Sequence, residues 1–169
     1  MRKGQSLFFI LTLCLLFSGC KVRYSMSGVD LGDAKTVSVT YFQSNAPLAK
    51  PTYSPALTEA LKDILVSQSS LNLVSSGADL QFEGSVTEYA ISPQAIQSGI
   101  DQAALNRLTI TVSVKFVNNK DEKKNFESSF TRYADYPSSQ NIDAVESSLI
   151  KTINDQLVQD IFNKALINW

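Results

Sequence analysis

The clearest pattern along the chain is a strict alternation of apolar and polar side chains over residues 107–117. The apolar positions are Leu108, Ile110, Val112, Val114 and Phe116, and the polar positions between them are Arg107, Thr109, Thr111, Ser113 and Lys115. Successive side chains of a β-strand point to opposite faces, so this alternation predicts a strand with one apolar and one polar face. A sheet built around such a strand is expected to be covered on one side only.

Four further segments have the β-branched and aromatic composition of strands, namely residues 36–42, 71–74, 80–89 and 125–133. In the first, Val37, Val39 and Tyr41 are expected to share one face. In the last, Phe126 and Phe130 are expected to do the same.

Turn signals indicate how these segments connect. Ser76-Gly77 separates the second and third of them and predicts that the two pair antiparallel. Residues 118–124 are polar and charged, and they predict a hairpin turn longer than the tightest type before the last strand. Residues 92–105 have little periodicity and are expected to form a loop, with at most a helical turn.

The first helical pattern begins at the end of the proline-rich residues 45–55. Ser54 and Pro55 are expected to act as its N-cap and first helical residue. Its apolar stripe consists of Leu57, Leu61, Ile64 and Leu65. This spacing predicts an amphipathic helix that ends near residues 67–70.

The second helical pattern is long, covering about 26 residues from Ile142, or about 39 Å at 1.5 Å per residue. Its apolar stripe contains Ile142, Val145, Leu149, Ile153, Leu157 and Ile161. Its polar face contains Glu146, Lys151, Asp155, Gln156 and Asp160. A helix lying on a membrane concentrates Lys and Arg on this face, so packing against the sheet is the favoured arrangement.

The order of elements predicts the fold class. A strand, a helix, four strands and a helix indicate an α+β fold, in which two helices pack on one face of a mainly antiparallel sheet of about four to five strands. No internal repeat or strong linker divides residues 36–169, so these residues are expected to form a single domain.

The beginning of the chain has the layout of an export signal. A basic start at Arg2 and Lys3 precedes an 11-residue run, LFFILTLCLLF, that is apolar except for one threonine. The run is shorter than the roughly 20 residues of an ordinary membrane span, so a cleaved signal peptide over residues 1–19 is favoured over a short retained anchor.

The residues around the expected cleavage point resemble a bacterial lipobox, with LFSGC at residues 16–20 and Phe17 where leucine is usual. The resemblance implies that Cys20 is lipidated, and that residues 20–35 form a lipidated tether anchored in the membrane. Several acyl chains provide the multiple attachment that stable anchoring requires. Lipoproteins sent to the outer surface in some envelopes resemble one another in carrying an acidic cluster after the lipidated cysteine. No such cluster follows Cys20, so the resemblance favours the periplasmic face of the outer membrane.

Charge and composition exclude several classes of partner and chemistry. Without residues 1–19 the chain has 13 basic and 16 acidic side chains, a net charge of −3, so no general attraction for nucleic acid is expected. The sequence contains no histidine, the commonest general base and metal ligand. Loss of Cys14 with the signal and acylation of Cys20 would leave no free thiol.

No catalytic motif is evident, and we expect no enzymatic activity, no cofactor and no metal. A P-loop, a GxGxxG motif and metal-ligand spacing are all missing from the sequence. A serine nucleophile activated by lysine stays open, although no matching motif is evident. Carboxylates are candidates for an acid–base pair, and those expected on strands are Glu83, Glu88, Glu127 and Asp135. Solvated strand residues are the simpler interpretation of these four side chains.

Four segments carry a resemblance to a known family: FEG at residues 82–84, NRLTI at 106–110, FTRYADY at 130–136 and DIFNKALINW at 160–169. Together with the lipobox and the expected α+β layout, they resemble the LptE family of lipopolysaccharide-assembly lipoproteins, in its Bacteroidetes-type form. The resemblance covers the whole chain after Cys20. None of the four segments is a catalytic signature.

The resemblance implies a non-enzymatic partner of LptD, the outer-membrane barrel that inserts lipopolysaccharide. Such a protein plugs the barrel, faces the periplasm and the barrel lumen, and contacts lipopolysaccharide itself. An auxiliary lipoprotein of a lipid-transport ABC system has a similar size and anchor, and remains the alternative. A lipid-anchored hydrolase using carboxylates is the third class.

Two groups of residues are candidates for these contacts. The candidate ligand-binding residues, which would hold the phosphates of a lipid, are Arg107, Lys115, Lys120, Lys123 and Lys124. The candidate partner-contact residues, on the polar face of the best strand, are Thr109, Thr111 and Ser113. A solvated turn is the alternative for the lysines, because Asp121 and Glu122 lie beside them.

Several other polar and aromatic residues have two interpretations. Arg132 follows the parity of the inward phenylalanines and is expected to pair with Asp135 or with a carboxylate of the last helix. Tyr133, Tyr136 and Trp169 are candidates for contact with a partner barrel, and Trp169 is equally suited to closing the core.

The lipobox generates the first testable prediction. Cys20→Ala should abolish metabolic labelling with fatty acid and release the protein from the membrane fraction, because the acceptor thiol is lost. Cys14→Ala, inside the apolar run, should leave labelling unchanged. Continued labelling of the Cys20→Ala protein would contradict the lipoprotein assignment.

Overall fold

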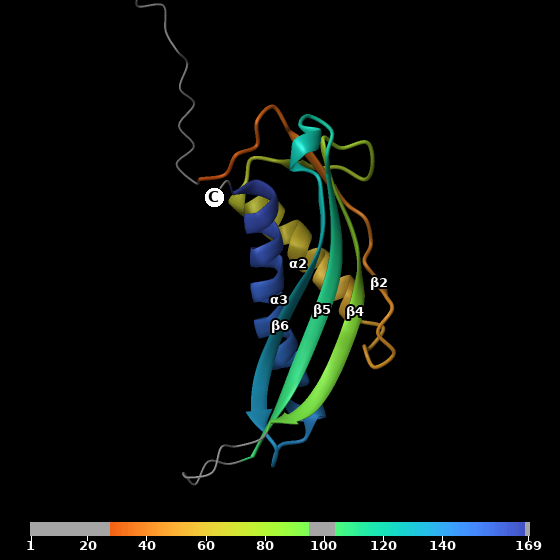
Figure 1. Cartoon of the computed structure of the whole chain (residues 1–169), viewed down its shortest axis with the longest axis vertical. Helices are drawn as coiled ribbons and strands as arrows, with labels where there is room; N and C mark the ends of the chain where they lie inside the picture. Colours follow the sequence, from red (N-terminus) through yellow and green to blue (C-terminus); the bar gives the residue numbers. More distant parts are fainter. Residues whose placement is uncertain (1–27, 95–103, 168–169) are drawn as a thin grey trace, which may run out of the picture.

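The computed structural model describes residues 28–94 and 104–167, which form two helices packed on one face of a mixed sheet (Figure 1). The described strands are β1 (Thr36–Val39), β2 (Gln43–Ser44), β3 (Asn72–Leu73), β4 (Leu80–Gln94), β5 (Leu105–Asn118) and β6 (Phe126–Pro137). The helices are α2 (Tyr53–Gln68), α3 (Ile142–Leu166) and the 3₁₀ turn η1 (Glu122–Lys124). The expected α+β class is therefore confirmed.

The strand order is β3-β1-β4-β5-β6, and β2 pairs with Ser85 and Val86 of β4, just beyond the residues of β4 that pair with β1. The long strands β4, β5 and β6 pair antiparallel, whereas β1 is parallel to both of its neighbours and β2 is parallel to β4. The expected antiparallel pairing of residues 71–74 with 80–89 is wrong, because β1 lies between β3 and β4. Helix α2 carries the chain over the sheet between β1 and β3, so β3 returns parallel to β1.

The alternation along β5 divides the sheet into two faces, as expected. Its five apolar side chains, from Leu108 to Phe116, are buried beneath the helices, and its polar side chains lie on the opposite face, which neither α2 nor α3 covers (Figure 1). The hairpin to β6 contains η1 in its turn, which confirms a turn longer than the tightest type. We call the uncovered side of β4, β5 and β6 the open face.

Helix α3 packs its apolar stripe on the sheet over 25 residues. Its first turn is capped by the Asn141 side chain, which accepts a hydrogen bond from the Asp143 amide.

In residues 28–94 and 104–167 no helix has the length and apolarity needed to cross a membrane. Glu146, expected on the wet face, is instead buried, where it accepts a 2.5 Å hydrogen bond from the Tyr89 hydroxyl and pairs with Lys50.

Helix α2 begins two residues earlier than expected. Thr52 precedes the helix, and Tyr53 is its first residue, so Ser54 is not the N-cap. Tyr53 is fully buried and donates a 2.7 Å hydrogen bond to the Asn154 side chain on α3. This contact with α3 fixes Tyr53 as the first residue of α2. Pro55 is tolerated because the amides of the first helical turn need no intrahelical acceptor.

The strands extend beyond their expected ends. Residues 92–94 and 105 belong to β4 and β5 rather than to a loop, because the two strands continue pairing as far as Gln94 and Leu105. Of the rest of that expected loop, residues 95–103 lie outside the described residues, and residue 104 precedes β5. The Tyr136 side chain, proposed for barrel contact, is buried in the core near the end of β6, so this proposal is wrong.

The chain after β1 departs from the expected face pattern. Val37 and Val39 are buried as expected, but Tyr41 is 53% exposed and Phe42 occupies the core instead. The strand ends at Val39, and the Thr40 amide still donates to the Phe82 carbonyl before the chain turns. The Phe42 ring then packs directly over Gly84, where a Cβ atom would lie 2.5 Å from the ring and 2.5 Å from the Ser113 carbonyl oxygen.

This close approach makes Gly84 a packing requirement. Gly84→Ala should lower the free energy of unfolding by about 1–3 kcal/mol, because the added methyl group overpacks the space beneath Phe42. The control is Ser85→Ala, which also introduces alanine but at the next position, on the open face. It should change the free energy of unfolding by less than about 0.5 kcal/mol. Chemical denaturation of both variants checks this, and equal midpoints for parent and Gly84→Ala would contradict it.

Candidate functional site

The open face is the largest polar surface that the long strands present together. The residues aligned across it in three rows are Glu83, Lys115 and Glu127; Ser85, Ser113 and Ser129; and Glu88, Thr111 and Thr131. A β-bulge between Val86 and Glu88 keeps this alignment after the register shifts by one residue. Short hydroxyl side chains therefore form the centre of the face, with charged groups toward its ends.

The three candidate partner-contact residues lie together on this face. Thr109, Thr111 and Ser113 are half-buried on β5, between the neighbouring strands. Thr111 donates a 2.8 Å hydrogen bond to Glu88 and lies 2.9 Å from the Thr131 hydroxyl. These bonds hold the hydroxyl groups in place across three strands, so the surface is already ordered before any partner arrives.

The candidate basic residues do not form one cluster. Arg107 and Lys115 are eight positions apart on β5, which separates them by about 27 Å at about 3.4 Å per residue. Arg107 makes two hydrogen bonds to Asp135, of 2.7 and 2.8 Å, and its guanidinium group lies 3.6 Å from the centre of the Tyr133 ring. This arrangement binds Arg107 to its own sheet.

Asp135 is correspondingly unsuited to acid–base work. The hydrogen bonds from Arg107 outweigh its partial desolvation and hold the pKa of Asp135 below the usual carboxyl range. The other carboxylate candidates are on the same open face, with Glu83 3.9 Å from the Lys115 ammonium group and Glu127 opposite Lys115 in the β5–β6 register. Lys115 is thus flanked by two carboxylates.

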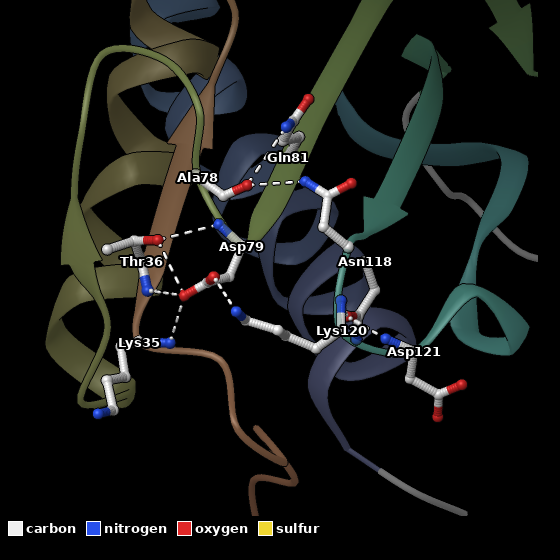
Figure 2. A network of polar contacts seen from close by, with 9 residues as sticks. Lys35, Thr36, Ala78, Asp79, Gln81, Asn118, Lys120 and Asp121 are labelled. Carbon is white, nitrogen blue, oxygen red and sulfur yellow. Dashed lines mark hydrogen bonds and ion pairs between the residues drawn. The ribbon is translucent and has the colours of Figure 1, made fainter.

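The three turn lysines follow the other end of β5, where Lys120 joins a network centred on Asp79 (Figure 2). The Asp79 carboxylate accepts hydrogen bonds from the Lys35 and Thr36 amides and the Thr36 hydroxyl, at 2.9–3.1 Å. Lys120 forms an ion pair with the same carboxylate at 3.0 Å. These bonds, led by that from the Lys35 amide, lower the pKa of Asp79 and keep it ionised.

The remaining two lysines differ from each other. The Lys124 ammonium group lies 2.7 Å from Asp30, and this pair joins the β5–β6 turn to the segment that enters the domain. Lys123 is exposed, and its ammonium group has no ion pair within residues 28–94 and 104–167. Lys120 and Lys124 therefore hold the fold together, while Lys123 extends toward solvent.

Arg132 confirms the expectation of an internal partner. Its guanidinium group makes two hydrogen bonds to Asp160 on α3, at 2.6 and 2.8 Å, and Asp135 pairs with Arg107 instead. Lys164 on the same helix lies 5.1 Å from the centre of the Phe126 ring. These contacts fasten the long helix to the edge strand β6. Trp169, the other candidate at this end of the chain, lies outside the described residues.

One depression of about 520 Å³ lies on the open face, where the segment after β1 rises beside β4. Thr40, Tyr41, Gln43 and Asn45 form its rim. Its floor contains Glu83, Ser85, Ser113, Lys115 and Glu127. The rim was not predicted from the sequence, because Tyr41 continues the apolar alternation of β1, which ends two residues earlier at Val39. We call this depression the open-face groove.

The fold and the polar face together define a small two-layer α+β protein in which α2 and α3 cover one side of the sheet and leave the open face uncovered. Within the described part of the chain, no group of three or more His, Cys, Asp or Glu residues is placed to hold a metal ion. The sequence matches the model of the LptE, lipopolysaccharide-assembly, family over residues 34–165. The chain therefore belongs to this family, which implies a role in lipopolysaccharide assembly at the cell envelope.

Solved structures support the fold. A minor lipoprotein from Acinetobacter baumannii is 20% identical, with a TM-score of 0.50 over 79% of this chain and 97% of that one. The hypothetical protein CT253 from Chlamydia trachomatis is 8% identical, with a TM-score of 0.53 over 78% of this chain and 98% of that one. No curated protein matches the sequence. At these identities the structures establish a shared architecture alone.

Proposed function

We propose that this protein is a non-enzymatic outer-membrane lipoprotein that supports lipopolysaccharide assembly by binding and plugging an LptD-type barrel. The observation that carries the proposal is the open face of β4, β5 and β6 in a chain of the LptE family. This surface is large, ordered and left uncovered by both helices (Figure 1).

The chemistry of the open face suits a hydrated barrel lumen. A lumen of this kind presents polar side chains and water, and contacts with it need groups that both donate and accept hydrogen bonds. Thr109, Thr111 and Ser113 provide such groups at the centre of the face, without large apolar side chains. The surface thus favours a wet contact with a polar wall over a dry interface between two apolar cores.

The expected lipid anchor at Cys20 determines where the domain would lie in the cell envelope. Residues 1–19 would be removed, Cys20 would carry the lipid in the outer membrane, and residues 20–35 would lead to the domain at 36–169. Asp30 is fixed to the end of α3 by the hydrogen bond from its amide to the Leu166 carbonyl, at 2.7 Å. The ten residues from Cys20 to Asp30 span at most about 35 Å, so this end of the domain would stay near the membrane on the periplasmic side.

The turn lysines lie at this anchored end, because Lys124 contacts Asp30 directly. We propose that Lys123 contacts phosphate groups of lipopolysaccharide there, with Lys120 and Lys124 adding to the local positive potential. Arg107 and Lys115 are also candidates for ligand binding. Both pair with carboxylates on the open face, so they would contact lipopolysaccharide from that face.

The alternative function is that of an auxiliary lipoprotein in a lipid-transport ABC system. Its size and expected anchor fit this function equally, but the partner would then be an inner-membrane assembly. A carboxylate hydrolase is less favoured, since Asp135 is held ionised by Arg107 and Glu88 accepts a hydrogen bond from Thr111. The identity of the partner therefore separates these functions.

Site-specific photocrosslinking tests the partner. A photoreactive residue at Thr109 or Thr111 should capture a large outer-membrane barrel in intact cells, because both positions face outward. The same residue at Ile110 should capture no partner, because Ile110 is fully buried under the helices. Capture of inner-membrane transport subunits would favour the alternative function, and absence of any captured protein would contradict the barrel proposal.

A charge reversal tests the lysine contact. Lys123→Glu should weaken binding of purified lipopolysaccharide by at least about fivefold, since loss of one lysine near an anionic surface costs about 1 kcal/mol and the new carboxylate adds repulsion. The loss should be larger in low salt than near 0.15 M, where exposed charges are screened over about 8 Å. Lys151→Glu, an exposed reversal on α3, is the control. Equal binding by Lys123→Glu and the parent would show that the turn is simply solvated.

A further inference from the structure

The open-face groove has a rim that is held rigidly before any ligand binds. The Phe42 side chain is fully buried, and its amide donates a 3.1 Å hydrogen bond to the Thr58 hydroxyl on α2. On either side of it, the Thr40 amide donates to the Phe82 carbonyl and the Asn45 amide to the Val86 carbonyl, both at 2.8 Å. The rim segment is therefore anchored at three points along its length.

This anchoring decides which side chains the rim presents. Because Phe42 points into the core, its neighbours Tyr41 and Gln43 lie on the other side of the chain and line the groove. Tyr41 is about half exposed and lines the cavity. Gly84 permits the arrangement, since any side chain there would collide with the Phe42 ring.

The chemistry of the lining narrows the class of ligand. Acyl chains are disfavoured because the floor consists of hydroxyl and charged groups, and polyphosphates are disfavoured because Glu83 and Glu127 flank Lys115. The remaining class of ligand is one rich in hydroxyl groups, which can hydrogen-bond with carboxylates, amides and an ammonium group at once. The volume of about 520 Å³ is in the range of sites for small ligands, about 300–1,000 Å³.

We propose that the open-face groove is a saccharide-binding site for neutral or amine-bearing sugar rings. The Tyr41 ring provides a platform for the C–H face of one ring. The Gln43 and Asn45 side chains on the rim, and Glu83 and Glu127 on the floor, exchange hydrogen bonds with its hydroxyl or amino groups. The inference deepens the proposed function and rests on it in one respect, since lipopolysaccharide is the envelope molecule that would supply such sugars.

Binding of defined sugars to the whole domain tests the site. The probe is the core oligosaccharide of lipopolysaccharide, freed of lipid A by mild acid and then dephosphorylated, titrated by calorimetry and by NMR of the labelled protein. A glucose polymer of similar length is a second probe from another source. Shifts confined to the groove residues are expected, and binding of both probes there would support a general saccharide site.

Two tyrosines make a matched pair of variants. Tyr41→Ala should weaken oligosaccharide binding about tenfold, because stacking on the ring is lost. Tyr133→Ala removes a ring of similar exposure, 50% against 53%, on the same open face. Tyr133 lies six positions along β6 from Glu127, about 20 Å away at about 3.4 Å per residue. Tyr133 is a candidate for barrel contact and stacks on Arg107, a candidate for phosphate contact, so its loss should leave binding of the dephosphorylated oligosaccharide unchanged.

The outcomes separate this inference from the proposed function. Absence of oligosaccharide binding by the parent, or equal affinity of parent and Tyr41→Ala, would overturn the saccharide site. Binding of intact lipopolysaccharide together with capture of the barrel would leave the proposed function standing in that case. Conversely, Tyr41-dependent sugar binding without capture of a barrel would support the groove and count against the proposed function.

Discussion

The burial of one face of β5 is the constraint on which the rest of the structure depends. Leu108, Ile110, Val112, Val114 and Phe116 must all leave water together, since they alternate along a single central strand. Both helices pack on that side, and a slip of one residue in either neighbouring strand would expose the core. The polar side chains of the same strand are consequently aligned on the opposite face, so the functional surface is a direct result of the packing.

A second constraint arises where the chain leaves the short strand β1. Phe42 has space in the core only because position 84 lacks a side chain, and the buried ring fixes the segment on either side of it. The same contact therefore completes the core and raises a rim over the open face. In this way residues 82–84, which carry part of the family resemblance, shape a surface feature through packing rather than by contacting a ligand themselves.

Ion pairs within the fold neutralise most of the basic side chains that were candidates for ligand binding. Arg107 and Arg132 each make two hydrogen bonds to one carboxylate, Asp135 and Asp160 respectively, which ties strand to strand and strand to helix. Lys120 and Lys124 likewise join turns that are distant in sequence. A sequence that contains several basic residues near one another thus presents far less free positive charge than their number indicates.

The sequence by itself determined the two-faced central strand and the long α3 helix, because each follows from a local period of hydrophobic residues. It also determined the longer hairpin turn, from the polar residues 118–124, and the α+β class, from the order of these elements. It also predicted an internal partner for Arg132 from parity alone. The tertiary structure decided the parallel pairing of β1, since strand order depends on where α2 crosses the sheet. It also decided the burial of Glu146 and the exposure of Tyr41. Both depend on contacts between segments far apart in the chain, which no local pattern encodes.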